Sequence, residues 1–155
     1  MIHPTFVLSI AVFGALCATA RADEFDDALK GIEKGVKDKA VADIKHFAAV
    51  LGNGFEKATP EQKKAFFPAM KKALAYPDKE TKQAVVEALG KSDTRAYEPL
   101  QAEFDKTKDD VEHQKKCVAS IGKLKDEKSG LGFLKKLLNH KTPDVVAAAI
   151  DAFAN

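Results

Sequence analysis

The sequence has no tryptophan and only two cysteines in its 155 residues, and its formal net charge is +2. Residues 23–155 contain Cys117 alone, which excludes an intramolecular disulfide in that part of the chain. The chain has no tryptophan for base stacking, and Arg95 is the only arginine after residue 22, which disfavours a nucleic-acid-binding function. The near balance of charge gives no strong attraction to a nucleic acid or a membrane. We therefore expect a domain that depends on its apolar core.

The N-terminal apolar run is short for a bilayer span. The stretch Phe6–Ala20 has 15 residues and no charge, whereas a transmembrane helix needs about 20 residues. This run precedes Ala20-Arg21-Ala22, a small-x-small cleavage site, which is typical of a secretory signal peptide, although Met1–Thr5 carries no lysine or arginine. We predict a signal peptide at residues 1–22 and a secreted or periplasmic domain at residues 23–155, with no stable membrane insertion after cleavage. An uncleaved anchor or a buried helix is the alternative.

No segment alternates apolar and polar residues in the manner of a strand. After residue 23, apolar residues instead recur at spacings of three and four, which is typical of amphipathic helices. Eight such stripes predict eight helices, and their first apolar positions are Phe25, Val41, Phe66, Thr81, Tyr97, Cys117, Leu131 and Val145.

Helix-boundary signals separate the stripes. Thr59-Pro60-Glu61-Gln62 predicts a capping box with proline at the first helical position, and Thr142-Pro143-Asp144 predicts a similar start. Gly52-Asn53-Gly54 predicts a left-handed cap after the second helix. Gly90 and Gly122 fall at or near the ends of two later helices.

Three of the stripes end in the same way, one every 32 residues. Val86, Val118 and Ile150 occupy one phase of this repeat, and the other phase consists of Leu89, Ile121 and Phe153. A fixed period of this size indicates stacked helical units. The predicted fold is an all-α solenoid of about four antiparallel helix pairs.

The segment Asp78–Gly90 resembles the second helix of a HEAT repeat, and so does Thr142–Phe153. Asp110–Gly122 is a poorer copy, because Lys116 stands where a small residue is expected. The resemblance implies a HEAT-like, armadillo-type scaffold over residues 23–155, whose second helices line a concave surface that binds a protein or an extended peptide. The candidate partner-binding residues that it implies are Lys79, Lys82, Glu87 and Gln114.

No motif predicts catalysis, a cofactor or a metal. His46, His113 and His140 have no spacing that places two of them on one helix face, and the acids near His113 suit a helix start. Cys117 falls on an apolar face, which favours a buried structural thiol over a nucleophile. The chain has no phosphate loop, nucleophile elbow or dinucleotide fingerprint. We expect a non-enzymatic, protein-binding scaffold without cofactors.

Two surface features leave alternatives open. Lysine doublets could form a basic stripe that binds an anionic polymer or a membrane surface, although interspersed acids favour a solvated face. The doublets begin at Lys63, Lys71, Lys115 and Lys135. The segment Ala147–Ala154 is almost wholly apolar except for Asp151, whereas solenoid ends are normally polar. We therefore expect the last helix to pack against a second copy or a protein partner.

Overall fold

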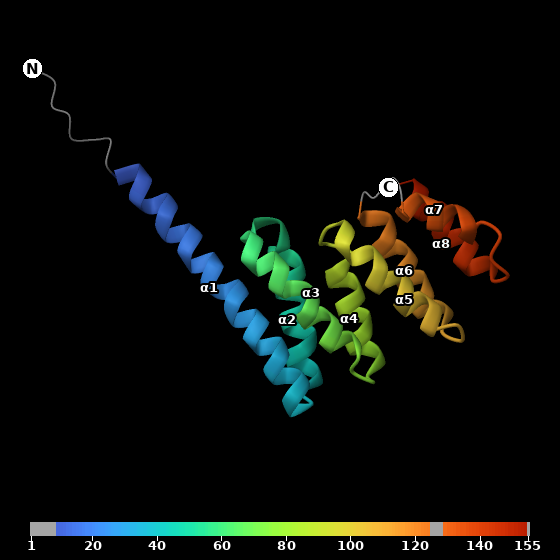
Figure 1. Ribbon diagram of the computed structural model, residues 1–155, viewed down its shortest axis with the longest axis horizontal. Coiled ribbons are helices and arrows are strands. Elements are labelled where there is room, and N and C mark those ends of the chain that lie inside the picture. Colours follow the sequence, from blue (N-terminus) through green and yellow to red (C-terminus); the bar gives the residue numbers. More distant parts are fainter. Residues whose placement is uncertain (1–8, 125–128, 155) are drawn as a thin grey trace, which may run out of the picture.

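The computed structural model describes residues 9–124 and 129–154, with side chains described for residues 23–124 and 130–154 (Figure 1). Within these ranges the chain forms eight α-helices, two short 3-10 helices and no strand, so the all-α prediction is confirmed. The α-helices are α1 (Ser9–Asp38), α2 (Val41–Gly54), α3 (Pro60–Leu74), α4 (Lys79–Leu89), α5 (Tyr97–Lys106), α6 (Val111–Lys123), α7 (Ser129–Leu137) and α8 (Pro143–Phe153). The 3-10 helices are η1 (Phe55–Lys57) and η2 (Thr94–Ala96).

The N-terminal part of α1 extends beyond the other helices (Figure 1). The predicted cleavage boundary at residue 22 lies inside α1, and residues 1–8 lie outside the described part of the chain. The side chain of Cys17, which belongs to the apolar run, also lies outside the described side chains. The signal peptide therefore stays a prediction.

Side-chain caps fix the starts of several helices. The predicted capping box is present: the amide N of Gln62 donates to Thr59 Oγ1 at 3.3 Å, and the amide N of Thr59 donates to Gln62 Oε1 at 2.9 Å. Asp78 caps α4 by accepting from the amide N of Thr81 at 2.7 Å. At α8, Pro143 occupies the start as predicted, but the side chain of Thr142 makes no capping hydrogen bond.

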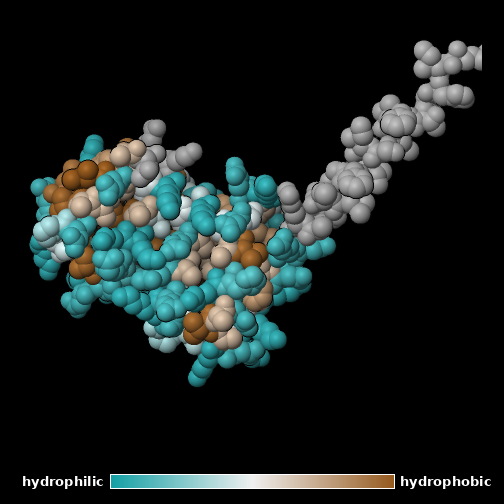
Figure 2. Space-filling view, turned by 180° about the vertical axis from the view of Figure 1, so that it is seen from behind, coloured by the Kyte–Doolittle hydropathy of each residue, from teal (hydrophilic) through white to brown (hydrophobic). Residues whose placement is uncertain are grey.

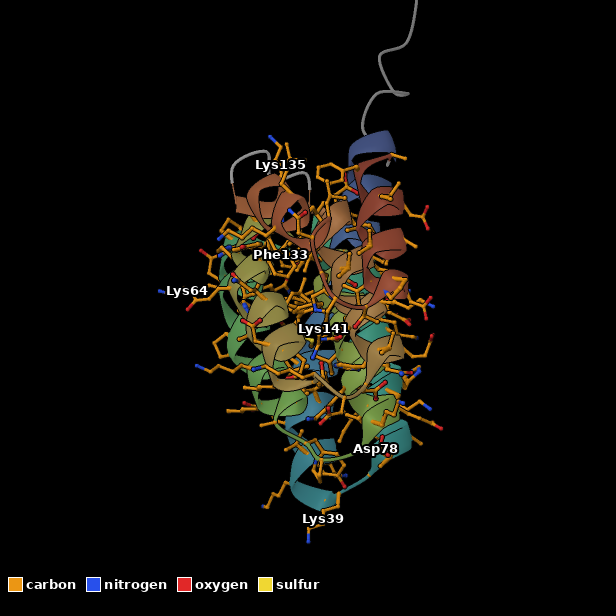
Figure 3. All side chains as sticks on the ribbon, turned by 90° about the vertical axis from the view of Figure 1, so that its right-hand side faces the viewer. Lys39, Lys64, Asp78, Phe133, Lys135 and Lys141 are labelled. Atoms are coloured by element: carbon orange, nitrogen blue, oxygen red, sulfur yellow. The ribbon has the colours of Figure 1, made fainter. Side chains whose placement is uncertain are left out.

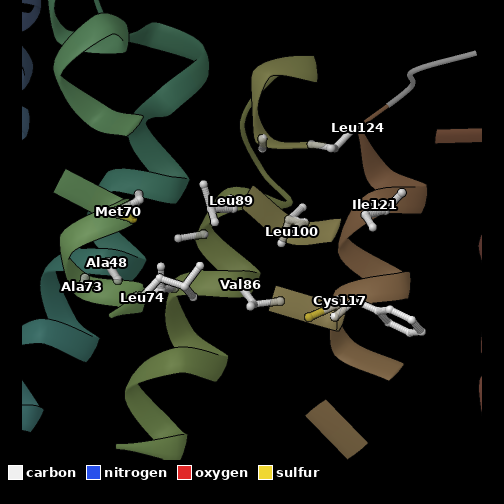
Figure 4. Close-up of a cluster of buried hydrophobic side chains, with 14 of the residues drawn as sticks. Ala48, Met70, Ala73, Leu74, Val86, Leu89, Leu100, Cys117, Ile121 and Leu124 are labelled. Atoms are coloured by element: carbon white, nitrogen blue, oxygen red, sulfur yellow. The ribbon is translucent and has the colours of Figure 1, made fainter. Parts of the chain in front are cut away.

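The even-numbered helices form a continuous row. Helix α2 packs against α4, α4 against α6, and α6 against α8, while each also packs against the odd-numbered helix that precedes it. The positions that repeat every 32 residues lie between these helices: Val86 and Val118 are 0 % exposed, and Leu89 and Ile121 are 1 % exposed. Figure 4 shows Val86, Leu89 and Ile121 in one apolar core that continues from helix to helix.

Three glycines permit close approach between successive even helices. A Cβ atom on Gly52 would lie 2.8 Å from Ala88 Cα, and a Cβ on Gly90 would lie 2.7 Å from Ser120 Cβ. A Cβ on Gly122 would likewise lie 2.7 Å from the Cβ of Ala152. The small residues opposite the glycines, at 88, 120 and 152, are themselves spaced by 32. Gly90 and Gly122 follow the same spacing, whereas Gly52 lies 38 residues before Gly90. A glycine therefore faces a small residue at each step of the row.

The left-handed cap predicted at Gly52-Asn53-Gly54 is wrong. Helix α2 runs through all three residues, and none of the described glycines has a positive φ. Gly52 is needed because the backbone of α4 approaches it, not because its own backbone must turn.

Candidate functional site

The candidate partner-binding residues on α4 are joined to neighbouring helices by ion pairs. Lys79 Nζ lies 2.8 Å from Asp110 Oδ2 at the start of α6, and Lys82 Nζ lies 3.5 Å from Glu103 Oε1 on α5. Glu87 Oε1 lies 2.5 Å from the Nζ atom of Lys116 on α6. These three side chains therefore connect consecutive helix pairs. Lys116, which departs from the HEAT pattern, supplies the partner of Glu87.

The fourth candidate, Gln114, lies inside the fold. Its side chain is 2 % exposed, and its Nε2 donates to the backbone oxygen of Phe104 at 3.4 Å. The structure thus brings Lys79, Lys82 and Glu87 to the junction of α4, α5 and α6, but it turns Gln114 inward.

Gln114 is one of four buried polar residues on α4, α5 and α6. Thr81, Glu103, His113 and Gln114 have exposed fractions of 0, 2, 1 and 2 %, respectively. We call the contacting pair Glu103 and His113 the buried polar cluster. Glu103 Oε1 lies 3.3 Å from His113 Nε2 and faces Lys82 from the other side. Burial raises the pKa of Glu103, but His113 and Lys82 outweigh it and leave the pKa below its ordinary value. The cluster therefore contains a carboxylate held in its charged form inside the protein.

The buried polar cluster has no route for a substrate, because its polar side chains are almost fully closed off from solvent. Cys117 is 0 % exposed, as predicted, and burial raises the pKa of its thiol to about 12. A thiol with that pKa is protonated at neutral pH and is a poor nucleophile. The geometry suits an electrostatic link between α4, α5 and α6 rather than a reaction centre.

Sequence analysis missed this cluster, although a signal was present. Glu103 falls three residues after Leu100, on the same apolar stripe, and His113 falls four residues before Cys117 on another. A charged residue in register with an apolar stripe on each of two helices indicates a buried pair.

Three of the eight lysines in the doublets form ion pairs with acids. Lys72 Nζ lies 2.7 Å from Glu33 Oε1, and Lys115 Nζ lies 2.9 Å from Glu112 Oε1. Lys116 pairs with Glu87 as described, and Lys63 donates to the backbone oxygen of Glu56 at 3.1 Å. These contacts reduce the free positive charge that binding to an anionic polymer would require.

A shallow hollow of about 360 Å³ lies between α1 and α2, and Asp23, Asp27 and His46 are among its lining residues. The ring of His46 packs edge-on against Phe47, with 5.1 Å between the centroids. Across the described side chains, no group of three or more histidine, cysteine, aspartate or glutamate residues is placed to hold a metal ion.

The exposed large apolar side chains gather at the C-terminal end of the helix row. Among the described side chains these are Leu131, Leu138, Ile150 and Phe153, with exposed fractions of 36, 42, 56 and 37 %. We call these four residues the end face. All four lie on α7, on α8 or directly after α7. Figure 2 shows hydrophobic surface at the end of the molecule far from the N-terminal segment, and Figure 3 looks onto that end.

The end face continues the repeat that is buried elsewhere. Val86 and Val118 are 0 % exposed, but Ile150, in the same phase, is 56 % exposed. Helix α6 covers Val86 and helix α8 covers Val118, and within the described chain no further helix follows α8. The surface that α4 and α6 bury against their successors is open to solvent on α8.

None of the helices in the described residues has both the length and the apolar character that a bilayer span requires. Comparisons of the chain with protein-family models, curated protein sequences and solved structures gave no match.

Proposed function

We propose that this chain is an exported, non-enzymatic, HEAT-like solenoid that binds proteins through its C-terminal end. Three observations support the solenoid: the 32-residue repeat, the continuous row of even-numbered helices, and the glycine contacts at each step of that row. Export rests on the predicted signal peptide at residues 1–22. Repeat stacks of this kind commonly act as scaffolds for other proteins.

The observation that carries the binding proposal is the end face. Large apolar side chains that cluster on one surface are typical of protein contacts, because covering them removes apolar area from water. Elsewhere in the row, the same phases of the repeat are buried because a further helix packs on them. Val118 and Ile121 are 0 and 1 % exposed, respectively. A protein that covers Ile150 and Phe153 would complete the same arrangement.

Substituting the end face is expected to abolish protein capture without unfolding the domain. The protein would be isolated as the cell produces it and immobilised. It would then be mixed with the extracellular or periplasmic fraction of the same cells. We expect the double variant Ile150→Asp/Phe153→Asp to lose the protein that the unmodified chain retains. Ala65→Asp, an exposed change on α3, is the matched control and should retain it. Retention of the same proteins by the double variant, with an unchanged helical circular-dichroism signal, would refute the proposal.

A further inference from the structure

We propose that His140 is a pH-sensitive link between α7 and α8, which releases the start of α8 when its ring is protonated. The inference goes beyond the proposed function and does not depend on it. Its basis is a hydrogen bond in the turn between the two helices, in which the backbone N–H of Thr142 donates to His140 Nδ1 at 3.2 Å. A ring nitrogen that accepts a hydrogen bond carries no proton, so this arrangement requires the neutral ring.

His140 contacts the helices on both sides of the turn. Its backbone N–H donates to the oxygen of Leu137, the last residue of α7, at 2.9 Å, while its ring accepts from the residue before α8. The ring packs edge-on against Phe104 of α5, with 6.0 Å between the centroids, and Phe133 of α7 packs against the same phenylalanine at 5.3 Å. These contacts hold the ring in the turn. His140 is half-buried, so water can deliver a proton to it.

The start of α8 differs chemically from three other helix starts in the chain. At α3, α4 and α6 a side-chain oxygen of Thr59, Asp78 or Asp110 accepts from a backbone N–H of the first turn. Thr142 makes no such bond at α8, and its own N–H is held by the imidazole. Hydroxyl and carboxylate oxygens remain acceptors from pH 5 to 8, whereas imidazole gains a proton within that range. Of these four starts, that of α8 is the one that depends on a histidine.

Protonation of the ring has two unfavourable effects on this turn. A protonated Nδ1 is itself a donor, so it opposes the N–H of Thr142 and leaves that amide without its acceptor. It also adds a positive charge beside the N-terminal end of α8, where the helix dipole is positive. Both effects weaken the first turn, in which the backbone N–H groups of Val145 and Val146 donate to Thr142 O at 3.1 and 3.2 Å. Because α8 carries half of the end face, acid loosens the helix that presents it.

The other charged groups around the turn do not ordinarily titrate in this range. Asp144 lies in the first turn of α8, within electrostatic reach of Lys115 on α6. The charged residues nearest in the chain to the turn and to Phe104 are Lys136, Lys141, Asp105 and Lys106. Lysine and aspartate side chains keep their charges between pH 5 and 8. His113 on α6 is the other histidine close to α5, where it pairs with Glu103, so variants of His140 are needed to separate the two responses.

Heteronuclear NMR of the protein, as the cell produces it, at a series of pH values from 8 to 5 tests the link. We expect the amide proton signal of Thr142 to move upfield in step with the ring signals of His140, because the amide loses its acceptor. The protection of the Val146 amide against hydrogen exchange, corrected for the intrinsic effect of pH, should fall about fivefold or more.

Two variants of His140 separate its proton from its acceptor. In His140→Asn the side-chain oxygen accepts from the amide two residues later, as in an Asx turn, and does not titrate. This variant should keep Val146 protected at both ends of the pH range. His140→Ala offers no acceptor and should leave Val146 equally unprotected at both. His46→Asn changes an exposed histidine on α2 and is the control, in which the acid response should remain.

Three results would overturn the inference. Unchanged protection of Val146 in the unmodified chain between pH 8 and 5 would show that the link does not open. An acid response that persists in His140→Asn would place its origin at another group. Full protection in His140→Ala at pH 8 would show that the hydrogen bond contributes nothing to the start of α8. No binding partner takes part in these measurements, so each failure leaves the proposed function standing.

Discussion

Replacing Glu103 with alanine is expected to lower the free energy of unfolding by about 3 kcal/mol at neutral pH, since removing one partner of a buried charge pair is strongly destabilising. Glu103 is 2 % exposed and lies 3.3 Å from His113 and 3.5 Å from Lys82. Without its carboxylate, His113 stays buried with no acceptor, and a cavity opens between α5 and α6. Urea denaturation followed by circular dichroism measures the change.

Glu98→Ala is the matched control, because Glu98 is an exposed glutamate on the same helix. This control should leave the urea midpoint nearly unchanged. Equal effects of Glu98→Ala and Glu103→Ala would mean that the buried position of Glu103 contributes nothing to stability.

The effect of Glu103 should depend on pH with a definite sign. The pKa of Glu103 is below its ordinary value of 4.5 in the folded protein. A carboxyl group whose pKa is lower when folded stabilises the fold above its ordinary pKa, and that contribution is lost as the pH falls through the folded pKa. The stability difference between the unmodified chain and Glu103→Gln should therefore be constant near neutrality and shrink below about pH 4.5. A difference that persists unchanged down to pH 3 would contradict this reasoning.

Replacing Gly90 with alanine is expected to cost about 2 kcal/mol of stability, although alanine is the better helix former. The new Cβ would lie 2.7 Å from Ser120 Cβ and 2.9 Å from Ser120 Cα, so α4 and α6 must separate. The backbone conformation itself is no obstacle, because φ at Gly90 is −65°. Urea denaturation of the variant measures the loss.

Gly132→Ala is the control for Gly90→Ala. Gly132 lies within α7, and an added Cβ there meets no atom within 4 Å. We expect this change to stabilise the protein by about 0.5–1 kcal/mol, the usual gain at an unhindered helical glycine. Equal gains at both glycines would show that α4 and α6 are not in close contact at Gly90.

The sequence alone predicts the eight helices, but it does not predict why each glycine stands near a helix end. Apolar spacing depends on positions within one helix, so it predicted all eight, and Thr59 and Gln62 carried a complete local capping signal. The sequence predicts a left-handed cap at Gly52, because the neighbour that requires this glycine, Ala88, is 36 residues away. A single sequence holds no direct signal of such a close approach.

The candidate site likewise has features that depend on local sequence and features that depend on contacts between distant residues. The apolar character of Ala147–Ala154 is a local feature, so the exposed α8 surface could be predicted from composition and position. The partners of Lys79 and Glu87 lie on α6 or at its start, 29 or more residues away. Their pairing depends on how α4 and α6 pack, which propensity and spacing do not determine.

The central claim is that α8 leaves exposed the surface that α4 and α6 bury. Val118→Asn and Ile150→Asn test it most directly, since both replace a β-branched residue in the same phase of the repeat. Urea denaturation would be measured at protein concentrations where the chain is monomeric. We expect Val118→Asn to cost about 3 kcal/mol or more, because it buries an unsatisfied amide, and Ile150→Asn to cost less than about 1 kcal/mol. Similar losses for the two variants would mean that Ile150 is buried within the single chain, and would contradict the account.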